Sequence, residues 1–314
     1  MPFEEATEEQ HEGVRRMKER LSGFETEVGR LKGLDFKPRP TDVFIVTSPK
    51  SGTTWTQHIV HGLRSRGSMD FQEISEVVPW IELAYDCGQD LESEQRFAPP
   101  RTFKSHCWYP HCPKGAKYVI VVRNPMEVAI SFYKFFQDWF FFEDDNVDVD
   151  TFVKEFVLQR GIPASPMNNA SLWHHLTSWW PHRNDETVLW LYYEDLKDDL
   201  PACVHKIAEF MGLEYDEERE RIVVSQSSIS FMKEHEHKFN EALTKKHRNG
   251  PCGLPEGAGC SGSKVSTGGR HGIALRAETA EQMEKKWADI VQPVTGFASY
   301  SEMLNATSFL RVPQ

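Results

Sequence analysis

The chain has 314 residues, and its 36 Lys and Arg against 47 Asp and Glu leave a formal net charge of −11. Because 39% of the residues are hydrophobic and 26% are charged, the composition excludes disorder, collagen and coiled coil as the main architecture. The acidic balance also argues against a protein that coats nucleic acid or anionic membranes, so an anionic ligand has to be captured at a local basic site.

Strand and helix patterns alternate along the chain. Apolar runs typical of buried parallel strands occur at residues 43–46, 118–122 and 188–193. Helical patterns cover residues 9–32, the segment from Thr53 onward, 126–136 after Pro125, 201–211 before Gly212, and 278–291 before Pro293. This alternation predicts a single-domain α/β fold with a parallel sheet flanked by helices, whose ligands bind beyond the carboxyl ends of the strands.

The domain organisation follows from the same patterns. The charged helix within residues 1–37 is expected to belong to the same domain as residues 38–314. Residues 250–272 are rich in Gly, Ser and Cys and predict a mobile loop, within which Cys252 and Cys260 are either two thiols or, under oxidation, a disulfide. No stretch approaches the ~18 apolar residues of a membrane span, and no signal-peptide pattern occurs at the start. We expect a cytoplasmic protein without a membrane or nucleic-acid partner.

The strongest chemical signal is the sequence PKSGTTW at residues 49–55, between the first strand and its helix. A glycine turn at this position lets backbone N–H groups converge on an anion at the helix N-terminus. Thr53 and Thr54 add hydroxyl donors, and Lys50 adds a positive charge. The loop is P-loop-like but is not a Walker A loop, because Lys50 precedes Gly52 and no second glycine stands upstream. The alternative is an ordinary strand-to-helix turn.

A second basic residue lies at the end of the next strand. Arg123 follows residues 118–122, at the same sheet edge as the glycine loop, and Ser131 stands eight residues further on. A guanidinium fork suits phosphate oxygens, and the hydroxyl could reach another oxygen. An arginine in this place is usually structural, but its position beside the first loop predicts a second anion contact.

These two segments, PKSGTTW and YVIVVRNPMEVAISFY, resemble the cytosolic sulfotransferase family, and the resemblance extends over residues 38–233. It implies 3′-phosphoadenosine 5′-phosphosulfate (PAPS) as co-substrate and adenosine 3′,5′-bisphosphate (PAP) as product. The family loop around the 5′-phosphosulfate corresponds to Lys50, Ser51, Gly52, Thr53 and Thr54. Trp55 matches the family tryptophan that stacks on adenine, and Tyr193 matches a residue that contacts adenine. Ser227 matches, more loosely, a residue that contacts the nucleotide. Arg123 and Ser131 match the 3′-phosphate ligands.

The catalytic residues are implied by the segment Phe103-Lys104-Ser105-His106, which resembles the family pattern K-[ST]-H. In that pattern the histidine is the general base that removes the acceptor's proton. Sulfuryl transfer is an in-line displacement like phosphoryl transfer, in which negative charge builds on the leaving oxygen. Lys50 would stabilise the leaving phosphate and Lys104 would add a second charge, so we expect no metal.

The chain departs from the family near its C-terminus. Gly268-Gly269-Arg270-His271-Gly272 stands where the family has R-K-G-x-x-G-D-W-K, so Arg270, His271 and Gly272 are the expected nucleotide contacts there. The usual family motif for dimerisation is also missing, which leaves a homodimer open.

The sequence predicts the acceptor pocket less clearly. Residues 78–82 resemble a family segment beside the substrate, which points to Trp80, and an aromatic run offers Phe135, Trp139 and Phe140. An aromatic-lined cavity favours a small, partly apolar molecule with a hydroxyl or amine. Three alternatives stay open: a dehydratase acting through a transient sulfate ester, a non-catalytic PAP-binding module and a variant P-loop kinase.

Overall fold

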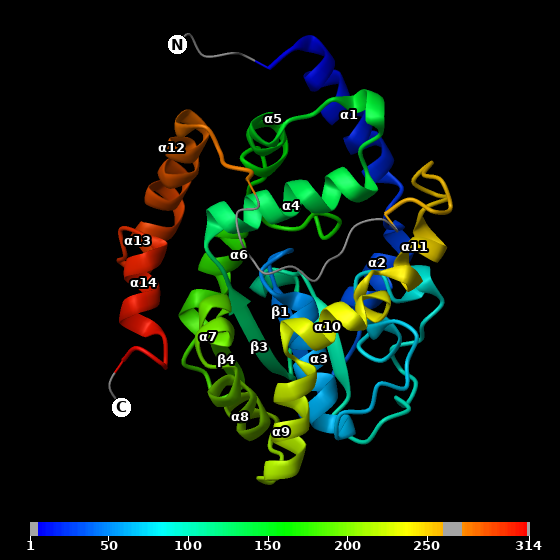
Figure 1. Cartoon of the computed structure of the whole chain (residues 1–314), viewed down its shortest axis with the longest axis vertical. Helices are drawn as coiled ribbons and strands as arrows, with labels where there is room; N and C mark the ends of the chain where they lie inside the picture. The colour runs from blue at the N-terminus through cyan, green and yellow to red at the C-terminus, as the bar shows by residue number, and fades with distance from the viewer. Residues whose placement is uncertain (1–5, 260–271, 313–314) are drawn as a thin grey trace.

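The computed structural model describes residues 6–259 and 272–312 and has three layers, helix, sheet and helix (Figure 1). The sheet has four parallel strands in the order β2-β1-β3-β4. Their bounds are Val43–Thr47 (β1), Thr102–Ser105 (β2), Lys117–Val122 (β3) and Val188–Tyr192 (β4). The predicted single-domain α/β fold is confirmed, with β2 as a strand that the apolar runs did not indicate.

Side chains on the two faces of the sheet enter two different cores. Phe44, Val46 and Ile120 pack with α4 (Pro125–Trp139) and α6 (Leu172–Trp179), whereas the intervening Ile45 and Val119 pack with α3 (Thr53–Ser65) and α8 (Leu200–Met211). Successive residues of a strand point to opposite faces, so a sheet covered on both sides needs apolar side chains at every position. This explains why the strands appear in the sequence as unbroken apolar runs.

The remaining helices surround this core. In Figure 1, α12, α13 and α14 form a column along one flank, and α1 and α2 lie on the other. Their bounds are Glu8–Ser22 (α1), Glu27–Leu34 (α2), Val149–Phe152 (α5), Tyr193–Asp198 (α7), Glu217–Gln226 (α9), Ile229–Glu234 (α10), Ala242–Arg248 (α11), Ala277–Lys286 (α12), Gln292–Thr295 (α13) and Tyr300–Thr307 (α14). No helix of the described ranges is long and apolar enough to cross a membrane.

The single helix expected at residues 9–32 is wrong, because the chain forms two helices there. Gly23 ends α1, and a Cβ added to it would lie 2.2 Å from the carbonyl oxygen of Pro251. Arg248 donates to the carbonyl oxygens of Gly23 and Phe24, at 2.7 and 2.8 Å, and so holds the bend in place. Thr26 then caps α2. The break depends on contacts with a distant part of the chain, which helical periodicity does not reveal.

Two other expected boundaries also move. The strand at 188–193 ends at Tyr192, and Tyr193 is the first residue of α7. The helix expected at 278–291 is not ended by Pro293: after α12 the chain makes a π-helical turn and continues as α13 until Gly296, whose φ is +82°. Pro293 lies in the first turn of α13, directly after the π-helical turn.

Parallel pairing brings the carboxyl ends of all four strands to one edge. Val46 is paired with Ser105, Thr47 with Val121, and Val122 with Tyr192. The chain leaves this edge through the glycine loop, through His106, through Arg123 and through α7. The segments that the sequence singled out for chemistry therefore begin within one small region.

Candidate active site

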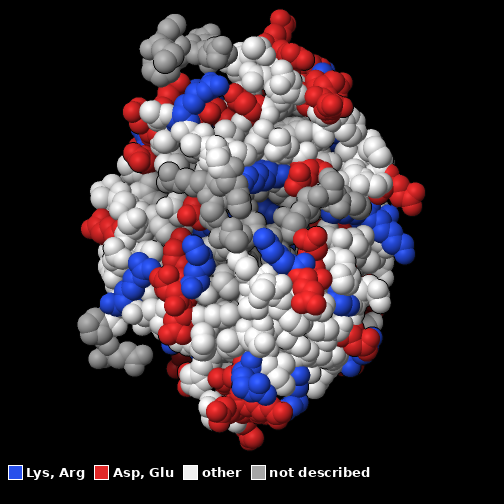
Figure 2. Space-filling view, viewed as in Figure 1, with Lys and Arg blue, Asp and Glu red and all other residues white. Residues whose placement is uncertain are grey.

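A cavity of about 780 Å³ opens at this edge of the sheet. Figure 2 shows a hollow at the centre of one face, with both basic and acidic side chains around it. The predicted site residues that line it are Lys50, Gly52, Thr53, Thr54, Trp55, Trp80, Lys104, His106, Arg123, Ser131, Phe135, Phe140, Tyr193 and Ser227. Most of the residues chosen from sequence thus share one cavity, whose volume suits a small-molecule site.

The glycine loop takes the conformation needed to cradle an anion. Lys50 and Gly52 both have positive φ values, +70° and +105°. A Cβ on Gly52 would lie 2.8 Å from the ring of Tyr193, so only glycine fits there. Gly52 is the N-cap of α3 and provides no side-chain cap, which leaves the first N–H groups of the helix for another acceptor. The loop is therefore suited to hold phosphate or sulfate oxygens.

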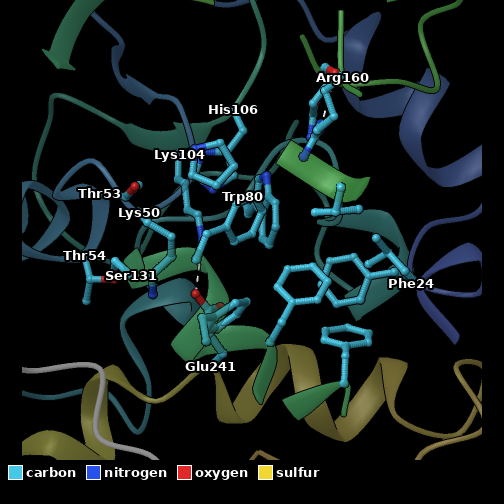
Figure 3. Close-up of a pocket in the computed structure, with 18 of the residues that line it drawn as sticks. Phe24, Lys50, Thr53, Thr54, Trp80, Lys104, His106, Ser131, Arg160 and Glu241 are labelled. Carbon is cyan, nitrogen blue, oxygen red and sulfur yellow. Dashed lines mark hydrogen bonds and ion pairs between the residues drawn. The ribbon is translucent and has the colours of Figure 1, made fainter. Parts of the chain in front are cut away.

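Arg123 is held between this loop and α4. Its Nη1 donates to the carbonyl oxygen of Lys50 at 3.2 Å, and its Nη2 to Glu127 at 2.8 Å. Its guanidinium lies 4.2 Å from the centre of the Tyr193 ring. Ser131 lies two turns along α4 and lines the same side of the cavity as Lys50 and Thr54 (Figure 3). A fixed guanidinium and a hydroxyl are therefore available beside the first loop.

Aromatic rings and an unpaired hydroxyl lie on the far side of the loop. The rings of Trp55 and Tyr193 meet edge to face, with centroids 5.7 Å apart. The indole N–H of Trp55 donates to the carbonyl oxygen of Ser227 at 2.9 Å. The buried Ser227 hydroxyl lines the cavity and has no hydrogen-bond partner within the described residues. A buried hydroxyl of this kind is costly unless a ligand satisfies it, so this region fits a flat, polar base.

His106 directly follows β2 and is held in one tautomer. Its Nδ1 lies 2.8 Å from the carbonyl oxygen of Thr47, and a carbonyl can only accept, so Nδ1 carries the proton. Nε2 therefore keeps a lone pair, as a general base requires. Burial, together with the nearby charge of Lys104, holds the pKa of His106 well below its usual value, so the ring is neutral near pH 7. Thr47 also bonds Thr53 at 2.6 Å, which links the base to the phosphate loop.

Glu82 is the residue that fixes the backbone at His106. Its buried carboxylate accepts from the backbone N–H of His106 at 2.6 Å and from the hydroxyl of Ser105 at 3.1 Å. The segment before Glu82 pairs with β2 through two backbone hydrogen bonds. The backbone N–H of Lys104 donates to the carbonyl of Pro79, and the backbone N–H of Ile81 donates to the carbonyl of Lys104. The segment predicted to border the substrate therefore positions the base as well.

Lys104 points into the cavity with a carboxylate partner. Its Nζ lies 3.2 Å from Oε1 of Glu241, and both side chains are almost fully buried. It also lies 3.9 Å from the centre of the Trp80 ring, which meets the His106 ring edge to face at 4.9 Å. Glu241, at the start of α11, was not anticipated from the sequence, since no motif surrounds it. The pair places one positive and one negative group beside the base.

The rest of the cavity wall is apolar and aromatic. It combines α4 with α1 and with the segment after α5, and its main rings are Phe24, Phe132, Phe135, Phe136, Phe140 and Phe156. Phe24 packs on Trp80 and Phe140, with centroids 5.9 and 5.8 Å apart. Phe24, Arg160 and Glu241 are wall residues that sequence reasoning missed. They come from segments far from any motif, and only the fold brings them here.

Five predicted site residues lie elsewhere or outside the described ranges. Trp139 does not line the cavity: its ring is buried, and its indole N–H donates to Asn249 at 2.8 Å. Ser51 is buried behind the loop and donates its backbone N–H to the carbonyl of Ser48. Gly272 does not line the cavity either. Arg270 and, next to it, His271 lie outside the described residues, as does Cys260, while Cys252 is a buried thiol.

Comparison with known proteins places the chain among sulfotransferases. A family model described as sulfotransferase domain matches residues 40–253. The chain is 34% identical over 209 residues to amine sulfotransferase from Oryctolagus cuniculus, a match that covers 63% of this chain and 65% of the relative. It is 31% identical over 222 residues to sulfotransferase 2A1 from Homo sapiens, covering 68% of this chain and 73% of the relative.

Two solved structures share the fold. Mouse sulfotransferase SULT7A1 complexed with PAP superposes with a TM-score of 0.62 at 19% identity, over 90% of this chain and 95% of that one. Retinol dehydratase in complex with androsterone and the inactive cofactor PAP gives 0.59 at 21% identity, over 94% and 98%. At these identities the likeness concerns the fold, whereas the family model covers more than half of the sequence. The chain belongs to the sulfotransferase family.

Proposed function

We propose that this protein transfers a sulfuryl group from PAPS to a hydroxyl or amine of a small molecule. The observation that carries this proposal is His106: its Nδ1–H is bound by the Thr47 carbonyl, and its lone pair on Nε2 shares a cavity with Lys50 and Lys104. A neutral base beside two ammonium groups matches a reaction that removes a proton at one atom and builds negative charge at another.

The nucleotide is assigned to the polar half of the cavity. Lys50 and the N-terminus of α3 would hold the 5′-phosphosulfate, because first-turn N–H groups and a lysine favour anions. Arg123 and Ser131 would hold the 3′-phosphate. The unpaired Ser227 hydroxyl and the rings of Trp55 and Tyr193 fit the adenosine. Arg270 and His271 remain predicted contacts of the 3′-phosphate.

The chemistry assigned to the chain has two parts. His106 accepts the proton of the acceptor's hydroxyl or amine at Nε2, which makes the acceptor atom nucleophilic as its new bond to sulfur forms. Lys50, Lys104 and the first N–H groups of α3 stabilise the charge that develops as the bond between sulfur and the phosphate oxygen breaks. PAPS supplies the sulfuryl group. Lys104 must share its charge between Glu241 and the reacting oxygens.

The acceptor is assigned to the aromatic half. A cavity of this size with phenylalanine walls suits a compact, partly apolar molecule, whereas a polymer would need an open groove. We place the reaction in the cytoplasm and assign the protein no nucleic-acid or membrane partner. A homodimer stays open.

An assay with PAPS tests this proposal. The protein is incubated with PAPS and a panel of phenols, alcohols and amines, and the products are identified by mass spectrometry. A sulfate ester or sulfamate formed together with PAP supports the proposal. A dehydrated acceptor would point instead to elimination through a transient sulfate ester. Absence of any product with His106 intact, together with tight PAP binding, would point to a non-catalytic PAP-binding module.

A further inference from the structure

Arg160 is a charged residue in the acceptor half of the cavity. It follows the π-helical turn Val153–Val157 and lines the wall on the side opposite Lys50 and Thr54 (Figure 3). Its Nη2 donates to the carbonyl oxygen of Asn169 at 3.3 Å. Its Nε and Nη1 have no hydrogen-bond partner among residues 6–259 and 272–312.

Two other cations of the wall, Lys104 and Arg123, have carboxylates beside them. Lys104 lies 3.2 Å from Glu241, and Arg123 lies 2.8 Å from Glu127. Glu25, whose charge acts on Arg160, is bound by Arg30 at 2.5 Å. Arg160 itself forms no ion pair with any described residue. Its guanidinium thus lies in the acceptor side of the wall without a carboxylate bound to it within the described residues.

An uncompensated charge in an apolar wall is unfavourable in the absence of a ligand. Burial lowers the pKa of Arg160 to about 10, which still leaves the guanidinium charged near neutral pH. Burial also raises the pKa of Glu25 to about 7, so this carboxylate loses part of its negative charge there. A charge taken out of water without a partner costs free energy that a bound counter-charge restores.

The balance of charge over the whole wall points the same way. The chain as a whole carries −11, yet its cavity is lined by five Lys and Arg residues against two Glu. Lys50, Lys104 and Arg123 lie where the anions of the nucleotide are assigned. Arg160, together with Lys18 on α1, is not assigned to the nucleotide and is available to bind another anion.

We propose that the acceptor carries a carboxylate at the end remote from its reacting hydroxyl, and that Arg160 binds this carboxylate. Nη2 has two N–H groups, of which one binds the Asn169 carbonyl. The other can act together with Nε or with Nη1, so one edge of the planar guanidinium matches a carboxylate in a bidentate arrangement. The same cavity is lined by Phe24, Phe140 and Phe156, so the body of the acceptor is apolar. The substrate class is therefore a hydroxylated carboxylic acid with an apolar core. This inference rests on the proposed sulfotransferase activity.

A matched series of acceptors tests the inference. ω-(4-Hydroxyphenyl)alkanoic acids with alkyl chains of increasing length are compared with their methyl esters as acceptors of the PAPS-dependent reaction. At the best length, the acid should exceed its ester in kcat/KM by roughly 10- to 100-fold, the value of a hydrogen-bonded charge pair. In Arg160→Gln the ratio should fall to about one, and Arg160→Lys should retain part of it.

Arg183→Gln is the matched control. Arg183 is also partly buried, donates to a backbone carbonyl (that of Trp180, at 2.9 Å) and lies against an aromatic ring, but it does not line the cavity. This variant should keep the wild-type ratio of acid to ester. A fall in both variants would show a general loss of packing and would overturn the assignment to Arg160.

Calorimetric titration of the same compounds onto the PAP-bound protein distinguishes a failure of the carboxylate inference from a failure of the proposed sulfotransferase activity. Tighter binding of acid than ester, lost in Arg160→Gln, supports the inference even if no compound is sulfated. Equal binding and equal turnover of acid and ester in the wild type overturn it and leave the sulfotransferase activity standing. If PAP does not bind at all, the proposed function fails, and the inference that rests on it fails as well.

Discussion

The two halves of the cavity are built in different ways. The nucleotide half is organised by strand ends: Lys50 lies in the loop after β1, and Arg123 and Tyr193 directly follow β3 and β4, with the base His106 directly after β2. The acceptor half consists of helix faces and loops from α1, α4 and the segment after α5. Strand ends are fixed by the hydrogen bonds of the sheet, whereas helix faces and loops are placed by side-chain packing.

We expect the nucleotide half to serve the reaction with every acceptor and the acceptor half to determine which acceptor is used. Charges of the nucleotide half are already positioned by protein partners, as Arg123 is by Glu127 and by the Lys50 carbonyl. In the acceptor half, Arg160 forms no ion pair with any described residue and lies within a wall of phenylalanine rings. Variants in the first half should therefore change donor binding and chemistry with every acceptor. Variants in the second half should change the choice of acceptor.

The largest effect is expected from the base. His106→Ala removes the proton acceptor, so kcat with a phenolic acceptor should fall by roughly 10²- to 10⁴-fold. The affinity for PAP, measured by calorimetry, should change little. A weakened affinity with kcat preserved would contradict the role of His106 as a base. His205→Ala is the control, because His205 lies on α8 and does not line the cavity.

The second largest fall in kcat is expected from the loss of Lys50. Lys50→Ala removes a donor that stabilises the leaving phosphate, and the loss of one such donor costs roughly 10²- to 10³-fold in kcat. The fall should be the same for all acceptors, measured under saturating acceptor. Lys117→Ala provides the comparison, since Lys117 lies at the opposite end of β3 and bonds the Phe210 carbonyl at 2.8 Å. Similar rates for Lys50→Ala and wild type would remove the lysine from the mechanism.

Arg123 tests the 3′-phosphate contact. Arg123→Gln should weaken binding of PAP by roughly 10- to 100-fold, because a hydrogen bond to a charged group is lost. Binding of adenosine 5′-phosphate, which lacks the 3′-phosphate, should be nearly unchanged, and so it serves as the internal control. Equal losses for both nucleotides in titration calorimetry would show that Arg123 supports the fold of the loop instead.

A variant in the acceptor half should change the binding of the acceptor without changing the affinity for the nucleotide. Phe24→Leu removes a ring that packs on Trp80 and Phe140, and KM for an aromatic acceptor should rise by roughly 3- to 10-fold. The dissociation constant of PAP should stay at the wild-type value. If PAP binding weakens as much as acceptor binding does, the two halves are not separate.

The smallest change is expected from acidification. The proposed mechanism requires a neutral His106, and burial together with the charge of Lys104 holds the pKa of His106 well below 6.5. As the pH falls from about 8 to about 6, kcat/KM should therefore stay nearly constant, and it should decline only at lower pH as the ring gains a proton. Measurement of log kcat/KM against pH checks this. A decline centred at or above pH 6.5 would contradict the assigned environment of the base.

The sequence could predict the nucleotide half because its signals are local. A strand followed by PKSGTTW, or by Arg123-Asn124-Pro125, gives the strand, the turn and the helix start within a few residues. Parallel strands then bring their carboxyl ends together without further information. Glu82 and Thr47, which hold His106, lie in segments that were recognised, but their contacts depend on the register of β1 and β2.

The acceptor half could not be predicted in the same way. The ring of Trp139 belongs to the aromatic run of α4, yet it turns toward Asn249 and not into the cavity. Phe24 reaches the wall only because Gly23 bends the chain against Pro251. Arg160 and Glu241 carry no motif, and their importance comes from the presence or absence of a charge beside them. Such features depend on contacts between distant segments, which periodicity does not encode.

The proposed sulfuryl transfer depends most directly on the nucleotide that this cavity binds. The measurement is a calorimetric titration of the full chain with PAP, beside adenosine 5′-phosphate and ATP. Tight binding of PAP that is lost when the 3′-phosphate is absent is the predicted result, because Arg123 and Ser131 face that phosphate in the proposal. Equal affinity for the three nucleotides, or no binding of PAP, would contradict the assignment of this cavity to PAPS.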